Sequence, residues 1–260
     1  MILRRVIEHV RKQEWTAIGI DLVVVVIGVV IGIQVSNWNA QRLDQRLAQR
    51  YLTDISADIR SDLTELARVE DSAMDRISAS AYILQQADIA ASSLEVKISD
   101  AEIEDLFANT GSIAIPVPPP PSESLRARLW EAAFNMYAFD MNRGAYDALV
   151  GAGKLDLIND PQIMRVLREY YYLVNVLDRT QQRTSFPIRN TTLEIGMAHG
   201  LSPGLMVDEA TLIAKVKATP PLAASVASSR QFAGLIFLLS KVQKQKGEEL
   251  LQLLAAESAT

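Results

Sequence analysis

The longest apolar stretch of the chain runs from Ala17 to Val35, and Asp21 is its only charged residue. As a helix these nineteen residues would rise about 28 Å, which is close to the thickness of the hydrocarbon layer of a bilayer. Trp15 and Trp38 flank the stretch, and indole rings favour the two membrane interfaces. The pattern therefore predicts a single transmembrane helix.

This helix divides the chain into a short tail (1–14), a membrane segment (15–38) and a large domain (39–260). A cleaved signal peptide would need small residues one and three positions before a cleavage site, and the residues around Ser36 and Ala40 do not provide them. We therefore expect an uncleaved anchor in the lipid bilayer. The tail carries four Lys and Arg, against three in the first twenty residues after the span, so the charge bias favours a cytoplasmic N-terminus only slightly.

One face of the anchor carries small and polar residues. At 100° per residue, Val25, Gly28 and Gly32 fall within about 40° of Asp21. A small-xxx-small pair lets two helices approach closely in lipid, and an acid within a span favours a helix that satisfies it. The face therefore predicts a contact with a second copy of the chain or with another membrane protein. A carboxylate at this depth can also reach the head groups, and glycine pairs occur by chance.

Hydrophobic residues recur every seven positions between Asn39 and Ala91, a segment without Pro or Gly. The first series is Leu52, Ile59, Leu66, Ala73, Ser80 and Ala87, and the second is Ile55, Val69 and Ile83. This period predicts an amphipathic helix that continues the anchor as a stalk and enters the domain. Five acids lie largely off the stripe and predict a solvated face: Asp54, Asp58, Asp62, Glu65 and Asp75.

The remaining pattern is helical throughout, with a proline-rich break at 116–121. Capping residues, glycines and prolines predict helices at 100–108, 125–136 (capped by Ser122 or Ser124), 143–150, 161–184, 188–199, 209–218 and 222–256. We expect Pro187 to kink or end one of them. No useful period-2 segment is present. The predicted fold is all-α, with the anchor and stalk followed by an antiparallel helical bundle.

Two sequence blocks resemble a bacterial family of single-span proteins of unknown function. The first is the end of the anchor, with an isoleucine-glycine repeat followed by Gln34 and Asn37-Trp38-Asn39. The second is 145–171, in which a helix, a Gly-Lys-Leu turn, Leu-Ile and a helix with Glu-Tyr-Tyr follow one another. The resemblance implies an anchor in the bacterial inner membrane and a periplasmic domain, and it implies no activity.

The candidate chemistry is sparse. The net charge is −5 in total, and the tail carries +2, so the rest of the chain carries −7, which argues against nucleic acid as a partner. There is no cysteine, and His9 and His199 would lie on opposite sides of the membrane. Gly151-Ala-Gly-Lys154 lacks the earlier glycine and the Ser or Thr of a phosphate-binding loop. We expect no enzyme, no metal and no cofactor.

One cluster has the composition of a binding surface. Arg165, Arg168, Tyr171 and Tyr172 lie close together in sequence, and tyrosines beside arginines suit a peptide, a carbohydrate or an aromatic ligand. Packing of these tyrosines in the bundle is the alternative. The sequence as a whole favours a membrane-anchored domain that binds or scaffolds a protein partner. The alternative is a periplasmic small-molecule sensor that signals through a membrane partner.

Overall fold

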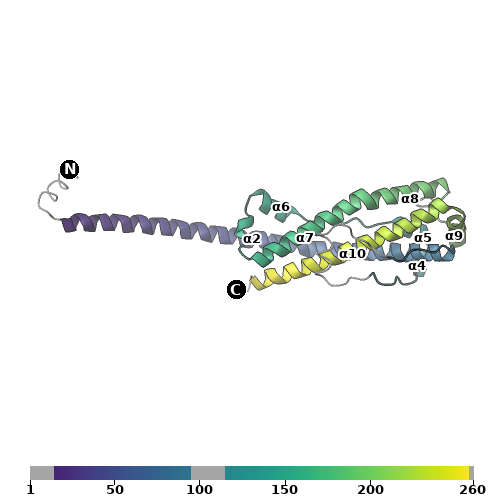
Figure 1. Cartoon of the computed structure of the whole chain (residues 1–260), viewed down its shortest axis with the longest axis horizontal. Coiled ribbons are helices and arrows are strands. Elements are labelled where there is room, and N and C mark those ends of the chain that lie inside the picture. The colour runs from purple at the N-terminus through teal and green to yellow at the C-terminus, as the bar shows by residue number, and fades with distance from the viewer. Residues whose placement is uncertain (1–14, 95–114, 258–260) are drawn as a thin grey trace.

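The computed structural model describes residues 15–94 and 115–257, and these residues form an all-α fold, as predicted. About 80% of the chain is helical, and no described residue lies in a strand. Figure 1 shows one helix that projects far beyond a bundle, with the C-terminus at the end of the bundle from which this helix emerges. The predicted short helix at 100–108 lies outside the described residues.

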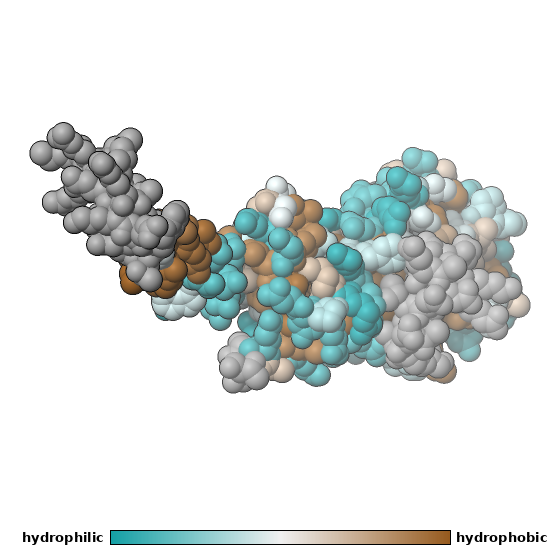
Figure 2. Space-filling view, turned by 60° about the vertical axis from the view of Figure 1, so that its left-hand side comes forward, coloured by the Kyte–Doolittle hydropathy of each residue, from teal (hydrophilic) through white to brown (hydrophobic). Residues whose placement is uncertain are grey.

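The projecting element is α2 (Trp15–Gln86), which has 72 residues and is about 108 Å long. Its apolar segment from Gly19 to Val35 has exposed side chains throughout and forms the brown band of Figure 2. The first fully buried side chain is that of Ile55. The predicted continuity of anchor, stalk and core helix is therefore confirmed, although α2 ends earlier than expected.

The end of α2 is set by Asp88, which has a φ of 58° and occupies the left-handed position that ends many helices. The Ile89 amide donates to the Leu84 carbonyl at 2.9 Å, which closes the turn. A helix reaching Ala91 was predicted because no glycine or proline occurs here, but aspartate also tolerates this conformation. The side chain of Asp88 then pairs with Lys217 on another helix.

Two long helices pack against the buried half of α2. The first is α10 (Pro220–Glu257), which runs antiparallel to α2 (Figure 1). The second is α7 (Pro161–Thr180), whose N-terminus is capped by the Asp160 carboxylate through the Gln162 amide at 2.7 Å. Gly247 of α10 lets the three helices approach closely, because a Cβ there would lie 3.1 Å from both Leu63 and Tyr170.

Pro187 neither ends nor interrupts the helical path that begins with α7. A π-helical turn, η2 (Gln181–Ser185), follows α7 directly and leads into α8 (Phe186–Ala198), with Pro187 in the first turn of α8. Proline lacks an amide hydrogen and pushes on the preceding turn, and a widened turn absorbs such an irregularity. His199 is the C-cap residue of α8, so this helix ends close to the predicted end at 199.

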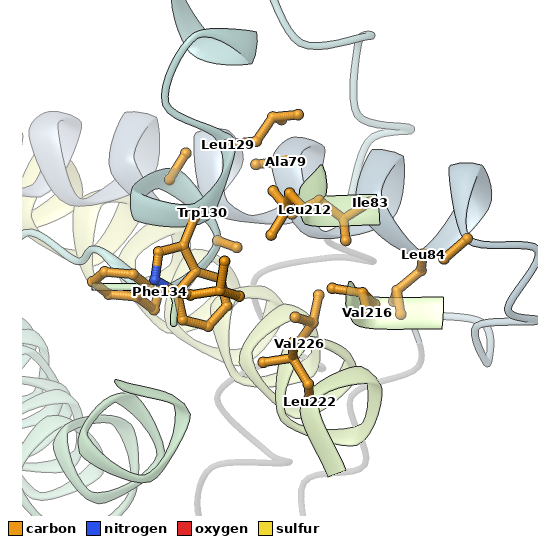
Figure 3. Close-up of a cluster of buried hydrophobic side chains, with 14 of the residues drawn as sticks. Ala79, Ile83, Leu84, Leu129, Trp130, Phe134, Leu212, Val216, Leu222 and Val226 are labelled. Atoms are coloured by element: carbon orange, nitrogen blue, oxygen red, sulfur yellow. The ribbon is translucent and has the colours of Figure 1, made fainter. Parts of the chain in front are cut away.

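Short helices close the end of the bundle that lies farthest from the apolar segment of α2 (Figure 1). The predicted helix at 125–136 is wrong as one element, because it is divided into α4 (Glu123–Arg126) and α5 (Leu129–Phe134). The Ser122 side chain caps α4, and α9 (Glu209–Ala218) has the bounds that were predicted. Figure 3 shows Trp130 and Phe134 packed with apolar side chains of α2, α9 and α10.

The opposite end of the bundle, from which α2 emerges, carries α6 (Gly144–Gly151) and a 3-10 turn, η1 (Leu155–Leu157). Gly153 has a φ of 65°, and the Lys154 amide donates to the Leu149 carbonyl at 3.1 Å. This is a helix C-cap followed by a turn.

Candidate functional site

A buried polar network lies where α2, α7 and the segment before α6 meet. Asp62 of α2 is 0% exposed and accepts hydrogen bonds from three groups. The Tyr170 hydroxyl donates to Oδ2 at 2.9 Å, and the backbone and side-chain nitrogens of Asn142 donate to Oδ1 at 3.0 and 3.1 Å. The expectation that Asp62 belongs to a solvated acidic face is therefore wrong.

The electrostatics of this network follow from its burial. Burial raises the pKa of Asp62, although the bonds from Asn142 and Tyr170 oppose the rise because they favour the charged form. Burial, together with the negative charge of Asp62, raises the pKa of the Tyr170 hydroxyl. Tyr170 therefore remains a hydrogen-bond donor at neutral pH. The network ties α7 and the loop before α6 to α2.

A second cluster of charged side chains lies on α7 and α10. Lys246 is 6% exposed, and its ammonium is 2.9 Å from Glu169 and 2.9 Å from Glu249. Burial acts to lower the pKa of Lys246, but the bonds to Glu249 and Glu169 outweigh it and raise the pKa. Arg165 joins the group through Glu169 at 2.9 Å. Arg165, one of the candidate binding residues of α7, therefore belongs to an ion-pair cluster at the surface of the bundle.

The other candidate residues of α7 lie in different environments. Arg168 is exposed, whereas Tyr171 is 2% exposed and stacks on Tyr146 of α6 with a ring-centroid distance of 3.8 Å. Tyr172 is half-buried and packs against apolar residues that include Val242. The structure therefore brings two arginines to the surface of α7, while the two tyrosines contribute mainly to packing.

Two further charged side chains are buried along α2. Glu70 pairs with Lys241 of α10 at 2.8 Å and lies 3.8 Å from Lys244. Arg76 is 3% exposed, and burial lowers its pKa to about 10. Glu70 and its two lysine partners therefore add charged groups to the contact between α2 and α10, beside apolar side chains of both helices.

The sequence does contain a signal for the buried polar residues. Asp62 and Arg76 occupy the two missing places of the seven-residue series formed by Ile55, Val69 and Ile83. A polar residue at such a place is turned toward the partner helices by the helical period. The series was interpreted only through its apolar members, and this is why these two residues were missed.

The candidate contact face of the anchor is unoccupied by any described part of the chain. Asp21, Val25, Gly28 and Gly32 are all exposed, and a Cβ built on either glycine would meet nothing within 4 Å. Each long helix, α2 and α10, is long and apolar enough to cross a membrane, but 61% of the apolar window of α10 is buried in the bundle and none of that of α2 is. Only α2 offers a free apolar surface of this length among the described residues.

Two small cavities lie in the described part of the chain. One cavity of about 220 Å³ lies between α2 and the α4–α5 segment and is lined by Ser72, Asp75, Arg128 and others. Another of about 120 Å³ lies beside Trp130. Pockets for small molecules usually measure about 300–1,000 Å³. Within 15–94 and 115–257, no three His, Asp or Glu side chains are grouped so that they could hold a metal ion.

Comparison with known proteins gives one match. The model of a family described as a family of unknown function (DUF6090) matches residues 21–125. The match covers most of the apolar segment, the stalk and the buried half of α2, and it ends in α4. The block at 145–171 lies outside it. No curated protein and no solved structure is significantly similar to the chain.

Proposed function

We propose that this chain is a bacterial inner-membrane protein with a single span, whose periplasmic helical domain binds or scaffolds a protein partner without catalysis. One observation carries the proposal. The apolar segment of α2 contacts no other described residue and continues without a break into the core of the bundle. A rigid rod of this kind holds a folded domain at a fixed distance from the membrane.

The bundle itself favours a protein partner over a small ligand. Apolar clusters and the Asp62 network occupy much of its interior, and the two cavities described above are smaller than a usual small-molecule pocket. Its surface presents charged groups that suit a protein contact, such as the exposed Arg168 and the ion-paired Arg165. The partner is a second copy of the chain or another membrane protein.

Membrane location and orientation have a direct test. In bacterial cells that express the full chain, the protein should remain in the membrane pellet after extraction at alkaline pH. Protease added to spheroplasts should degrade the domain, while the tail at 1–14 should be protected. Recovery of a soluble chain without its first forty residues would contradict the anchor, and a protected domain would contradict the orientation.

Partner binding is tested by crosslinking in native membranes followed by mass spectrometry. A reproducible crosslink between the domain and one other protein, or between two copies with no response to small ligands, supports scaffolding. Homodimers alone, together with a thermal shift of the full chain by a small molecule, would support the sensor and overturn the proposal.

A further inference from the structure

The first turns of α2 beyond the apolar segment carry a row of arginines. Arg42, Arg46 and Arg50 follow one another at intervals of four residues, so they span about 80° of the helix surface, with Trp38 about 40° before the first of them. All three arginines are exposed, and so is Trp38. No other described residue forms an ion pair with them. They form one basic stripe on the stalk.

Their height above the hydrocarbon layer follows from the helix. If Trp38 lies at the interface, Arg42 is about 6 Å, Arg46 about 12 Å and Arg50 about 18 Å farther along the axis. Arg42 therefore lies at the level of the head groups in an upright helix, and Arg50 approaches them only when the helix tilts toward the face that carries the arginines. The head-group layer is about 5–8 Å thick on each side of the hydrocarbon layer, and a long arginine side chain can extend toward it. Arg42 already leans back in this direction, because its guanidinium lies over the Trp38 ring at 4.8 Å from the centroid.

The acid nearest to Arg42 and Arg46 is directed away from this stripe. Asp44 is the only acid between 36 and 53, and it lies about 160° from Arg42 around the helix. The next acid, Asp54, follows Arg50 by four residues, on the side away from the apolar segment. Its carboxylate is 3.9 Å from the ammonium of Lys154, in the turn after α6. The contact offsets part of the charge of Asp44 and places this corner of the bundle about 9 Å beyond Trp38 along the axis.

From this arrangement, and on the basis of the membrane anchor proposed above, we infer that the stripe of Arg42, Arg46 and Arg50 binds the phosphates of anionic lipid head groups. Guanidinium groups suit phosphate oxygens because they donate paired hydrogen bonds and keep their charge. Each basic residue near an anionic membrane surface favours binding by roughly five-fold. Since the stripe lies on one face of a continuous helix, binding also tilts the rod toward that face.

The test uses the full chain in phosphatidylcholine vesicles that contain a trace of spin-labelled lipid. The fraction of label whose motion is restricted by the protein is measured for phosphatidylglycerol and for phosphatidylcholine. We expect a preference for phosphatidylglycerol of about two-fold or more at low salt, which declines as sodium chloride is raised. The triple variant Arg42→Gln, Arg46→Gln, Arg50→Gln should lose at least half of this preference.

A matched control changes three exposed arginines of the bundle, Arg60→Gln, Arg128→Gln and Arg183→Gln, and should keep the preference. The tail is the same in all proteins, so its own basic residues cancel in the comparison. Equal preferences in the two triple variants would overturn the inference. So would removal of the preference by inorganic phosphate at an ionic strength at which chloride has no effect, because the site would then be one for free phosphate.

The same measurement also distinguishes a failure of the proposed membrane span from a failure of the head-group site. If neither lipid is restricted by the unmodified chain, α2 does not enter the bilayer, and the proposed function fails together with the inference. If both lipids are restricted equally, the span is intact and only the head-group site is refuted.

Discussion

At the scale of single residues, the interior of this bundle depends on a few polar side chains at positions that the helical period turns inward. Asp62 is the clearest case, because three donors surround a carboxylate that water does not reach. Such bonds satisfy the charge but do not remove the cost of taking it out of water. A polar interior of this kind favours one packing of α7 against α2 over others, because a shifted helix would leave the carboxylate without its partners.

Replacement of Asp62 by asparagine should therefore change how stability depends on pH. Burial raises the pKa of Asp62 in the folded protein, so the folded state holds this proton more tightly than the unfolded state does. Stability is then highest below the unfolded pKa of about 4 and declines as the pH rises through the folded value. Relative to that of Asp62→Asn, the free energy of unfolding of the unmodified protein should fall over this pH range by about 1.4 kcal/mol for each unit by which folding raises the pKa of Asp62.

The measurement is chemical denaturation of both proteins at several pH values between 3.5 and 7.5 (roughly the span over which a buried carboxyl titrates). Tyr170→Phe should deepen the decline, because it removes a hydrogen bond to the charged form. Asp54→Asn, at an exposed position of the same helix, should leave the pH dependence unchanged. A constant difference between Asp62→Asn and the unmodified protein at all pH values would refute the role assigned to this carboxyl.

At the scale of elements, the sequence predicts the long helices well because their signals are local. Caps and prolines set the start of α7 and of α10 closely, and α9 has both ends where they were expected. The division of 125–136 into α4 and α5 has no such signal, since the break at Ala127 and Arg128 depends on how Trp130 and Phe134 enter the core. The stacking of Tyr171 could not be predicted from its neighbours in the sequence either, because its partner Tyr146 lies on another helix.

The contact between α8 and α5 gives a prediction for one glycine. A Cβ on Gly196 would lie 2.1 Å from Cζ2 of the Trp130 indole, which is rigid and 4% exposed. Gly196→Ala should therefore destabilise the domain by about 1–3 kcal/mol, although alanine favours a helix more than glycine does. Gly151→Ala, at the end of α6 with nothing within 4 Å of its Cβ, should be neutral or slightly stabilising. Thermal unfolding of both variants decides the matter, and an unchanged melting temperature for Gly196→Ala would contradict this packing.

At the scale of the whole molecule, α2 has two uses, since one end offers bare apolar surface and the other forms the core of the domain. Gly28 and Gly32 belong to this scale because no other described residue of the chain lies within 4 Å of a Cβ built on them. Gly28→Ile with Gly32→Ile should reduce self-association in a membrane two-hybrid assay toward the level of a monomeric span, since the larger side chains keep two backbones apart. Gly19→Ile is the control, because Gly19 lies about 160° from Asp21 around the helix. Equal signals for the two variants would remove the proposed contact face.

The continuity of α2 raises the question of whether the domain needs the stalk in order to fold, and a pair of proline variants answers it. Gln45 and Ser61 are both exposed, but Gln45 precedes the first fully buried residue, Ile55, whereas Ser61 lies within the bundle. Proline in a helix interior costs about 3 kcal/mol or more. Ser61→Pro should lower the melting temperature by about 6–12 °C. Gln45→Pro should lower it much less, because the part of α2 before Ile55 contacts the bundle only through half-buried positions such as Asp44, which lies 3.9 Å from Lys154. A large loss for Gln45→Pro would mean that the stalk and the bundle unfold as one unit, and that the membrane helix transmits strain directly to the domain.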